Sequence, residues 1–157
     1  MTKLHRQISD IDYEYPEDEQ FFVSLLGEDA LISDIFDFRD AKFKRREFAK
    51  VRQHIMREFF AAGRIKCELR LLDSCNDNDL VLDHIVPLSS NELNKRIRKL
   101  PPPRGKKIQR QSFGSNHPGN LLVACTKCNG HKKHRFIKTD GENWIIVDKN
   151  DPIWAIN

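Results

Sequence analysis

Apolar residues in the first 62 positions recur at helical spacing. Between residues 17 and 38 they occur in pairs, and Gly27 interrupts the series, so the pattern predicts two short helices. Residues 41–62 predict a longer helix, which Asp40 can cap and Gly63 can end. The residues that form its apolar stripe are Phe43, Phe48, Val51, Ile55 and Phe59.

After residue 65 the pattern changes to one typical of strands. Residues 80–86 mix β-branched and apolar side chains between polar residues and Pro87, which predicts a strand, and residues 120–124 predict another. Ser89 and Glu92 have the spacing of a capping box, so we expect a short basic helix to about Leu100. The remaining expected elements are a polar, basic loop over 104–119, a short helix over 127–135, and a hairpin that reaches 144–147 through a turn at Asp140 and Gly141.

Charge is strongly segregated along the 157 residues. The formal net charge is only +4, but residues 1–40 carry −8, whereas residues 95–138 carry +13 without a single carboxylate. A polyanion facing this run would relieve its self-repulsion, so nucleic acid is the expected partner, with a solvated, disordered loop as the alternative. The basic face of the helix over 41–62 is either solvated or in contact with DNA: Lys42, Lys44, Arg45, Arg46 and Arg52.

Composition excludes several classes of protein. Hydrophobic residues make up 39% of the chain and charged residues 32%, and ten phenylalanines are enough for a modest core in one domain. No run of eighteen apolar residues exists, so we expect no membrane span. The first twenty residues lack the apolar segment of a secretion signal, so we expect a cytoplasmic protein. In that compartment cysteines hold metals more often than they form disulfides.

The four cysteines form two pairs about fifty residues apart. Cys125 and Cys128 have the C-x-x-C spacing that brings two thiolates to one tetrahedral Zn²⁺, and no βαβ pattern suggests a redox motif instead. Cys67 and Cys75 are the available partners for a Cys₄ structural zinc site, although their spacing is wider than that of a usual zinc knuckle. Zinc would stabilise a unit with so little apolar area to bury.

Asp83 and His84 lie near the end of the first predicted strand. A histidine can act as a general base on water because its pKa lies near neutrality, and a carboxylate oxygen is a suitable ligand for Mg²⁺. Since side chains alternate along a strand, the two residues have separate roles rather than forming a direct pair. Two further polar residues with candidate chemistry are Asn120, at the start of the second strand, and Asn129, directly after Cys128.

The order and spacing of these residues resemble the HNH endonuclease family with its ββα-metal motif. The resemblance covers about residues 65–136, from the Asp83-His84 strand through the long loop and Gly119-Asn120-Leu-Leu-Val-Ala to Cys125-Thr-Lys-Cys128-Asn129. Asn129 stands where the last histidine of the family name is usual, as in the H-N-N branch. The resemblance implies an α+β fold with a ββα-metal finger braced by the Cys₄ zinc site. Together with the pattern of apolar residues, it predicts an N-terminal helical region over 1–62 and a nuclease domain with a C-terminal hairpin over 63–157.

The resemblance also implies roles for individual residues. His84 is expected to be the general base, Asp83 and Asn129 the ligands of one catalytic Mg²⁺ or Mn²⁺, and Asn120 a brace for the loop. If Asn129 does not face the metal, His134 is the first substitute. The expected phosphate contacts, in the basic loop and after Asn129, are Arg104, Lys106, Lys107, Arg110, Lys132, Lys133 and Arg135.

Two other functions fit the same sequence. A non-catalytic, zinc-stabilised DNA-binding module accounts for the cysteines and the basic run but leaves Asp83 and His84 without a role. A nuclease subunit that depends on a partner, for example in an antiviral defence system, accounts for all of them. The acidic residues 1–40 then form a simple helical scaffold; the alternatives are that they dock a protein partner or fold over the basic surface and mask it. DNA is the expected substrate, and RNA is an alternative.

Overall fold

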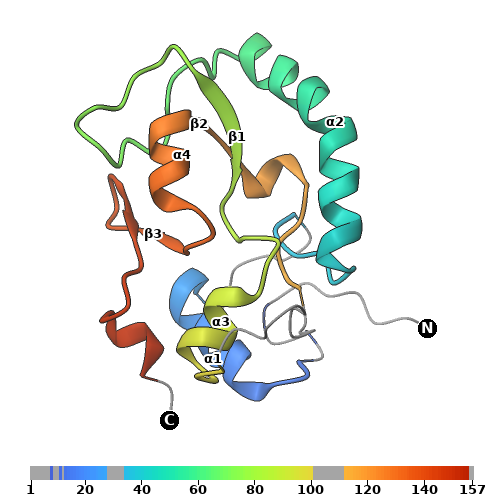
Figure 1. The fold of residues 1–157 in the computed structure, drawn as a ribbon, viewed down its shortest axis with the longest axis vertical. Coiled ribbons are helices and arrows are strands. Elements are labelled where there is room, and N and C mark those ends of the chain that lie inside the picture. The colour runs from blue at the N-terminus through green and yellow to red at the C-terminus, as the bar shows by residue number, and fades with distance from the viewer. Residues whose placement is uncertain (1–7, 9–10, 12, 28–33, 101–111, 156–157) are drawn as a thin grey trace.

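The computed structural model describes Ile8, Ile11 and residues 13–27, 34–100 and 112–155, and its fold is drawn in Figure 1. Within these residues the chain is a small mixed α+β protein with two separate two-stranded sheets. Its helices are α1 (Pro16–Leu26), α2 (Ala41–Ala61), α3 (Asn91–Arg96) and α4 (Thr126–Lys132). Its strands are β1 (Leu80–His84), β2 (Leu121–Cys125), β3 (Ile137–Thr139) and β4 (Trp144–Ile146). None of the described helices has the length and apolar content needed to cross a membrane.

An antiparallel pair, β1 and β2, lies between two helices (Figure 1). In its register Leu80 pairs with Cys125 and His84 pairs with Leu121, and α4 begins directly after β2. Leu121 and Val123 pack against α2, whereas Leu122 and Ala124 pack on the side of Cys128 in α4. Since successive side chains of β2 point to opposite faces, α2 and α4 cover opposite sides of the pair.

The long helix α2 has the expected ends. The Asp40 side chain accepts a hydrogen bond from the Lys42 backbone N–H at 2.7 Å, and Gly63 follows the helix with φ +85°. Ile55 and Phe59 are buried against β2, as the apolar stripe predicts. The other three residues of the predicted stripe are less buried: Phe48 and Val51 are half-buried, and Phe43 is 45% exposed.

Phenylalanines form the largest core cluster and join both ends of the chain. Phe22 in α1 lies 4.9 Å from Phe36 and 4.8 Å from Phe113, measured between ring centroids. Phe21 lies 4.8 Å from Phe136, which directly precedes β3. Residues from both predicted regions, 1–62 and 63–157, therefore share one core.

The second helix expected between residues 17 and 38 is not present in the described part of that segment. Residues 34–38 are not helical, and Phe36 instead forms an isolated antiparallel bridge with Gly114. The Asp37 N–H donates to the Phe113 carbonyl at 2.7 Å. The helix prediction for residues 34–38 is wrong because a segment distant in the sequence supplies their hydrogen bonds.

The capping box expected at Ser89 is also wrong. The helix α3 spans only Asn91–Arg96, and its N-cap residue is Ser90. The Glu92 carboxylate does not reach back to the cap; it is buried and accepts from Arg96 Nε at 3.1 Å. The Glu92 carboxylate therefore pairs with Arg96 instead of accepting a hydrogen bond from the backbone at the start of the helix.

Two segments expected to be polar and exposed are buried. Lys44 of α2 is 0% exposed, and its ammonium donates to the Gly114 carbonyl at 2.6 Å and to the Asp37 carbonyl. The described end of the loop over 104–119 packs inward, since Phe113, Ser115 and Asn116 are buried. The Lys44 ammonium can be buried because these two carbonyls replace water as its hydrogen-bond partners. The loop end packs inward because Phe113 belongs to the phenylalanine cluster.

The phenylalanine cluster can be tested by truncating Phe22. We expect Phe22→Ala to lower the free energy of unfolding by about 3–5 kcal/mol, because a fully buried ring leaves a cavity. Phe60→Ala on α2 is the control; its ring is 40% exposed, and a loss below about 1 kcal/mol is expected. Urea unfolding followed by circular dichroism measures both, and equal losses would contradict the cluster.

Candidate functional site

All four cysteines converge at one place beside β2. Cys67 and Cys75 come from the segment between α2 and β1, Cys125 ends β2, and Cys128 lies in α4. Their sulfur atoms lie within 4.8 Å of one another, and Cys75 Sγ is 3.7 Å from Cys125 Sγ. A tetrahedral Zn²⁺ with Zn–S bonds of about 2.3 Å requires sulfur atoms about 3.8 Å apart. The cluster therefore fits a structural Cys₄ metal site.

Backbone groups support the cluster electrostatically. The Leu71 N–H donates to Cys128 Sγ and the Cys128 N–H donates to Cys125 Sγ, both at 3.3 Å. Although burial acts in the opposite direction, backbone donors lower the pKa of Cys125 to about 6, which favours the thiolate that binds zinc. Burial raises the pKa of Cys75 and of Cys128 in the absence of a metal. The wide spacing of Cys67 and Cys75 is accommodated by a folded turn, in which Asp77 accepts from the Cys67 N–H at 2.8 Å.

A pocket of about 300 Å³ opens where β1 ends. Asp83 and His84 line it together with Arg45 and Phe48 of α2. Lys132, at the end of α4, and the following Lys133 and His134 line its other side. The two adjacent residues singled out in the sequence therefore open onto one pocket whose other charged residues are basic.

Asp83 is a buried carboxylate with one cationic neighbour. It is 7% exposed, and both of its oxygens lie 3.3 Å from Lys132 Nζ. Oδ2 nevertheless accepts no hydrogen bond among the described residues. Burial raises the pKa of Asp83, and the Lys132 ammonium acts in the opposite direction. A buried carboxylate oxygen with free acceptor capacity suits a hard divalent cation, so Asp83 fits as a metal ligand.

Lys132 differs from the surface phosphate contact that its sequence position suggests. It is 1% exposed, and its ammonium donates to the His84 carbonyl at 2.9 Å as well as to Asp83. The side chain thus ties the end of α4 to the end of β1. Lys133 remains exposed in the pocket, whereas Arg135 is half-buried and donates to the carbonyls of His131 and Lys132.

His84 is held between the loop before β2 and the helix α2. Its Nε2 lies 2.9 Å from Asn116 Oδ1, and the Phe48 ring packs edge-on with 4.6 Å between ring centroids. Burial lowers the pKa of His84 to about 4, against the effect of the hydrogen bond, so the imidazole is neutral at pH 7. The pKa near neutrality that the sequence suggested for this histidine is therefore wrong, because the side chain is removed from water. No pattern in the sequence indicates that Asn116 or Phe48 contacts His84, because these contacts join segments that are distant along the chain.

Asn120 is fully buried and bonded on both sides of its amide. Its Oδ1 accepts from the Val86 N–H at 2.8 Å. Its Nδ2 donates to the carbonyls of Val86 at 3.0 Å and Ser115 at 2.9 Å. These bonds fasten the segment after β1 to the loop before β2, and therefore fix the direction in which the chain leaves His84.

The other predicted site residues are less closely gathered. Asn129 is half-buried on α4 but is not among the residues that line the pocket. His134 does line it and is exposed, with Nε2 3.7 Å from Glu92 Oε1. Four expected phosphate contacts lie outside the described residues: Arg104, Lys106, Lys107 and Arg110.

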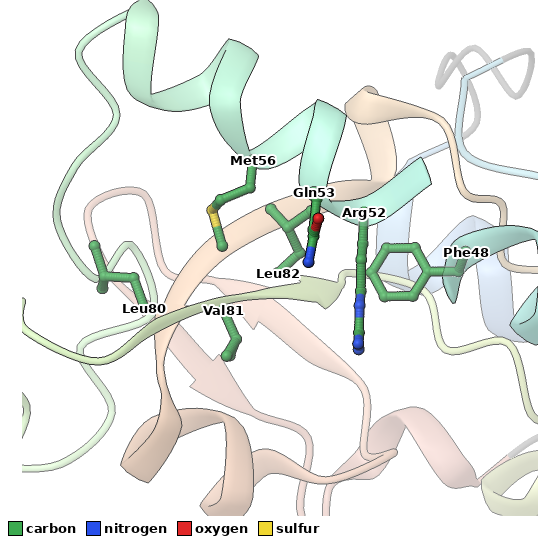
Figure 2. A pocket seen from close by; sticks show the side chains of 7 residues that line it. All are labelled: Phe48, Arg52, Gln53, Met56, Leu80, Val81 and Leu82. Carbon is green, nitrogen blue, oxygen red and sulfur yellow. The ribbon is translucent and has the colours of Figure 1, made fainter. Parts of the chain in front are cut away.

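A second cavity, of about 360 Å³, lies between α2 and β1 (Figure 2). Phe48 lines both cavities, which makes them neighbours. Arg52, Gln53 and Met56 extend from α2 over β1, and Arg52 lies beside Phe48 near the end of the strand. Asp83 is the single acidic residue in the lining of these two cavities, as far as the described residues form it.

Comparison with protein-family models, curated proteins and solved structures finds no match for this chain. A function must therefore be argued from the two arrangements described above, the cysteine cluster and the basic pocket at the end of β1.

Metal removal tests the cysteine cluster. We expect the purified protein to hold one zinc per chain, and a chelator to lower its unfolding temperature. If free zinc is at about 1,000 times its dissociation constant, its binding should raise the free energy of unfolding by about 4 kcal/mol. Elemental analysis and thermal unfolding measure these effects, with Cys128→Ser expected to lose both metal and stability. A protein that is purified without zinc, and whose unfolding temperature does not change with chelator, would contradict the site. As the control, adding Zn²⁺ but not Mg²⁺ after chelation should restore the unfolding temperature.

Proposed function

We propose that this chain is a metal-dependent HNH endonuclease that hydrolyses phosphodiester bonds of DNA, with RNA as the alternative substrate. The observation that carries the proposal is the pairing of two groups in one basic pocket. One is the neutral imidazole of His84, and the other is the buried Asp83 oxygen without a hydrogen-bond partner. A general base and a hard cation ligand are the two groups that metal-assisted phosphodiester hydrolysis requires.

In this proposal Asp83 and Asn129 hold one Mg²⁺ or Mn²⁺. When bound, the ion supplies positive charge that stabilises the scissile phosphate and the leaving 3′-oxygen. Because Asn129 is not part of the pocket lining, His134 is the substitute ligand that we would test first. Lys132 holds the Asp83 carboxylate in place, and the proposed Zn²⁺ has no chemical role beyond bracing the fold.

His84 would accept a proton from water as the water oxygen attacks phosphorus. Its neutral state supports this role, since only an unprotonated ring nitrogen can take the proton. Asn120 is the proposed brace that keeps the segment after His84 in position, and its three hydrogen bonds support that role.

The nucleic-acid strand is proposed to lie across the two neighbouring cavities, which share Phe48. Arg45 and Arg52 flank Phe48 on the side of α2 that faces β1, and Lys133 lies on the far side of the pocket. Cations of this kind neutralise phosphates, and an aromatic ring between them offers a surface on which a base can stack.

Replacing the proposed base gives a direct test of the activity. We expect His84→Ala to reduce Mg²⁺-dependent nicking of supercoiled plasmid by about 10²-fold or more, while DNA affinity stays nearly unchanged. Plasmid gels measure nicking, and fluorescence anisotropy measures binding. His131→Ala, an exposed histidine outside the pocket lining, is the matched control. Wild-type activity in His84→Ala would refute the mechanism.

The strand path predicts a difference between two arginines of α2. Arg52 lines the cavity, whereas Arg57 is exposed and does not. We expect Arg52→Ala to weaken DNA binding and to reduce the salt dependence, the slope of log K against log[salt], by about 1. Arg57→Ala should change both values less. Titrations at several salt concentrations measure this, and equal effects of the two variants would argue against this path.

A non-catalytic DNA-binding module is the second candidate, and one observation favours it. Lys132 already neutralises Asp83, so that carboxylate has a partner without any divalent ion. Salt-dependent DNA binding, together with no nicking in Mg²⁺ or Mn²⁺, would support this function over the nuclease.

A further inference from the structure

Asn116 joins the proposed base to the N-terminal half of the chain. It lies in the segment before β2, is 7% exposed, and its Oδ1 lies 2.9 Å from His84 Nε2. Its Nδ2 donates to the Lys44 carbonyl at 2.8 Å and to Glu47 Oε1 at 3.1 Å, both in α2. One buried amide therefore contacts three groups, and each contact constrains the other two.

The partners of Asn116 decide which way its amide points. A backbone carbonyl only accepts hydrogen bonds, and so does an ionised carboxylate. Glu47 is ionised, because hydrogen bonds from Arg39 and Asn116 lower the pKa of its carboxyl. The nitrogen of the amide must face these two acceptors, which leaves the oxygen facing His84. An oxygen that can only accept requires a donor, so the proton of the neutral imidazole belongs on Nε2.

We propose that Asn116 is a positioning residue that fixes His84 as the Nε2–H tautomer, so that Nδ1 is the nitrogen that accepts the proton. The tautomer follows from the hydrogen bonds alone, and its catalytic use rests on the function proposed above. Without this bond the imidazole exchanges between two tautomers, and in one of them an N–H occupies the position of the base.

The groups behind Asn116 are themselves fixed. Lys44, whose carbonyl accepts from the amide, is anchored by its own buried ammonium on the carbonyls of Asp37 and Gly114. The carboxylate of Glu47 accepts from Arg39 at 2.9 Å. One helical turn after Lys44, the ring of Phe48 packs against the imidazole. The helix α2 thus sets both the tautomer and the plane of His84.

The tautomer can be read directly by ¹⁵N NMR of the zinc-loaded full chain at pH 7. Long-range ¹H–¹⁵N correlations report which ring nitrogen carries the proton, and the His84→Ala spectrum identifies the His84 signals. We expect a protonated Nε2 and an unprotonated Nδ1 in the wild type. Asn116→Ala should move both shifts toward an average, whereas Asn150→Ala, an exposed asparagine in the turn after β4, should leave them unchanged.

A second variant covers the event that Asn116→Ala does not fold. Asn116→Leu keeps nearly the same side-chain volume but removes both the acceptor toward His84 and the donor toward the Lys44 carbonyl and Glu47. We expect Asn116→Leu to move both shifts toward an average, as in Asn116→Ala. Protonated Nδ1 in the wild type, or the wild-type tautomer unchanged in Asn116→Ala, would overturn the proposal.

Kinetics separate this inference from the proposed function. We expect Asn116→Ala to lower kcat for plasmid nicking about 10–100-fold with little change in KM, as is usual when the partner of a functional histidine is removed. A wild type with the Nε2–H tautomer but no nicking would remove the nuclease and leave the positioning role intact. Nicking at the wild-type rate by Asn116→Ala would remove the catalytic role of Asn116 and leave the nuclease intact.

Discussion

The pairing register of β1 with β2 is the constraint on which the rest of the site depends. His84 pairs with Leu121 and Asp83 with Leu122, so the two adjacent side chains leave opposite faces of the strand pair. Asp83 meets Lys132 of α4, and His84 meets Phe48 of α2. A slip of one residue would exchange these partners and leave a carboxylate against the apolar side of α2. The three hydrogen bonds of Asn120 stabilise this register at the end where the pocket opens.

The buried charges in the described part of the chain each have a specific partner. Lys132 lies against Asp83, Lys44 donates to two backbone carbonyls, and Asp18 of α1 pairs with Arg98 at 2.5 Å. An unmatched buried charge costs several kcal/mol, so each pair restricts how the surrounding segments can pack. The Asp18–Arg98 contact also joins α1 to Arg98, a residue of the basic run over 95–138.

The N-terminal helices belong to the same packed structure as the proposed catalytic elements. Phe21 and Phe22 of α1 share a core with Phe113 and Phe136, and α2 covers one face of the strand pair. The division at residue 62, drawn from the change of pattern, therefore does not separate two packing units. In the proposed nuclease, α2 supplies Phe48, Arg45 and Arg52 beside the pocket. This helix precedes residues 65–136, the segment that resembles the HNH family, and still shapes the site.

The sequence by itself determined the features that depend on local spacing. It predicted α2 with its cap, the two strands, the C-terminal hairpin and a cysteine set that could hold a metal, because periodicity, turn residues and C-x-x-C spacing act over a few positions. It could not determine the bridge from Phe36 to Gly114, the burial of Lys44 and Lys132, or the bond from Asn116 to His84. Those features join residues 32 to 78 positions apart, or depend on which face a neighbour covers. Only the tertiary structure decides them, because most buried polar groups need a hydrogen-bond partner and the fold determines which distant segment supplies it.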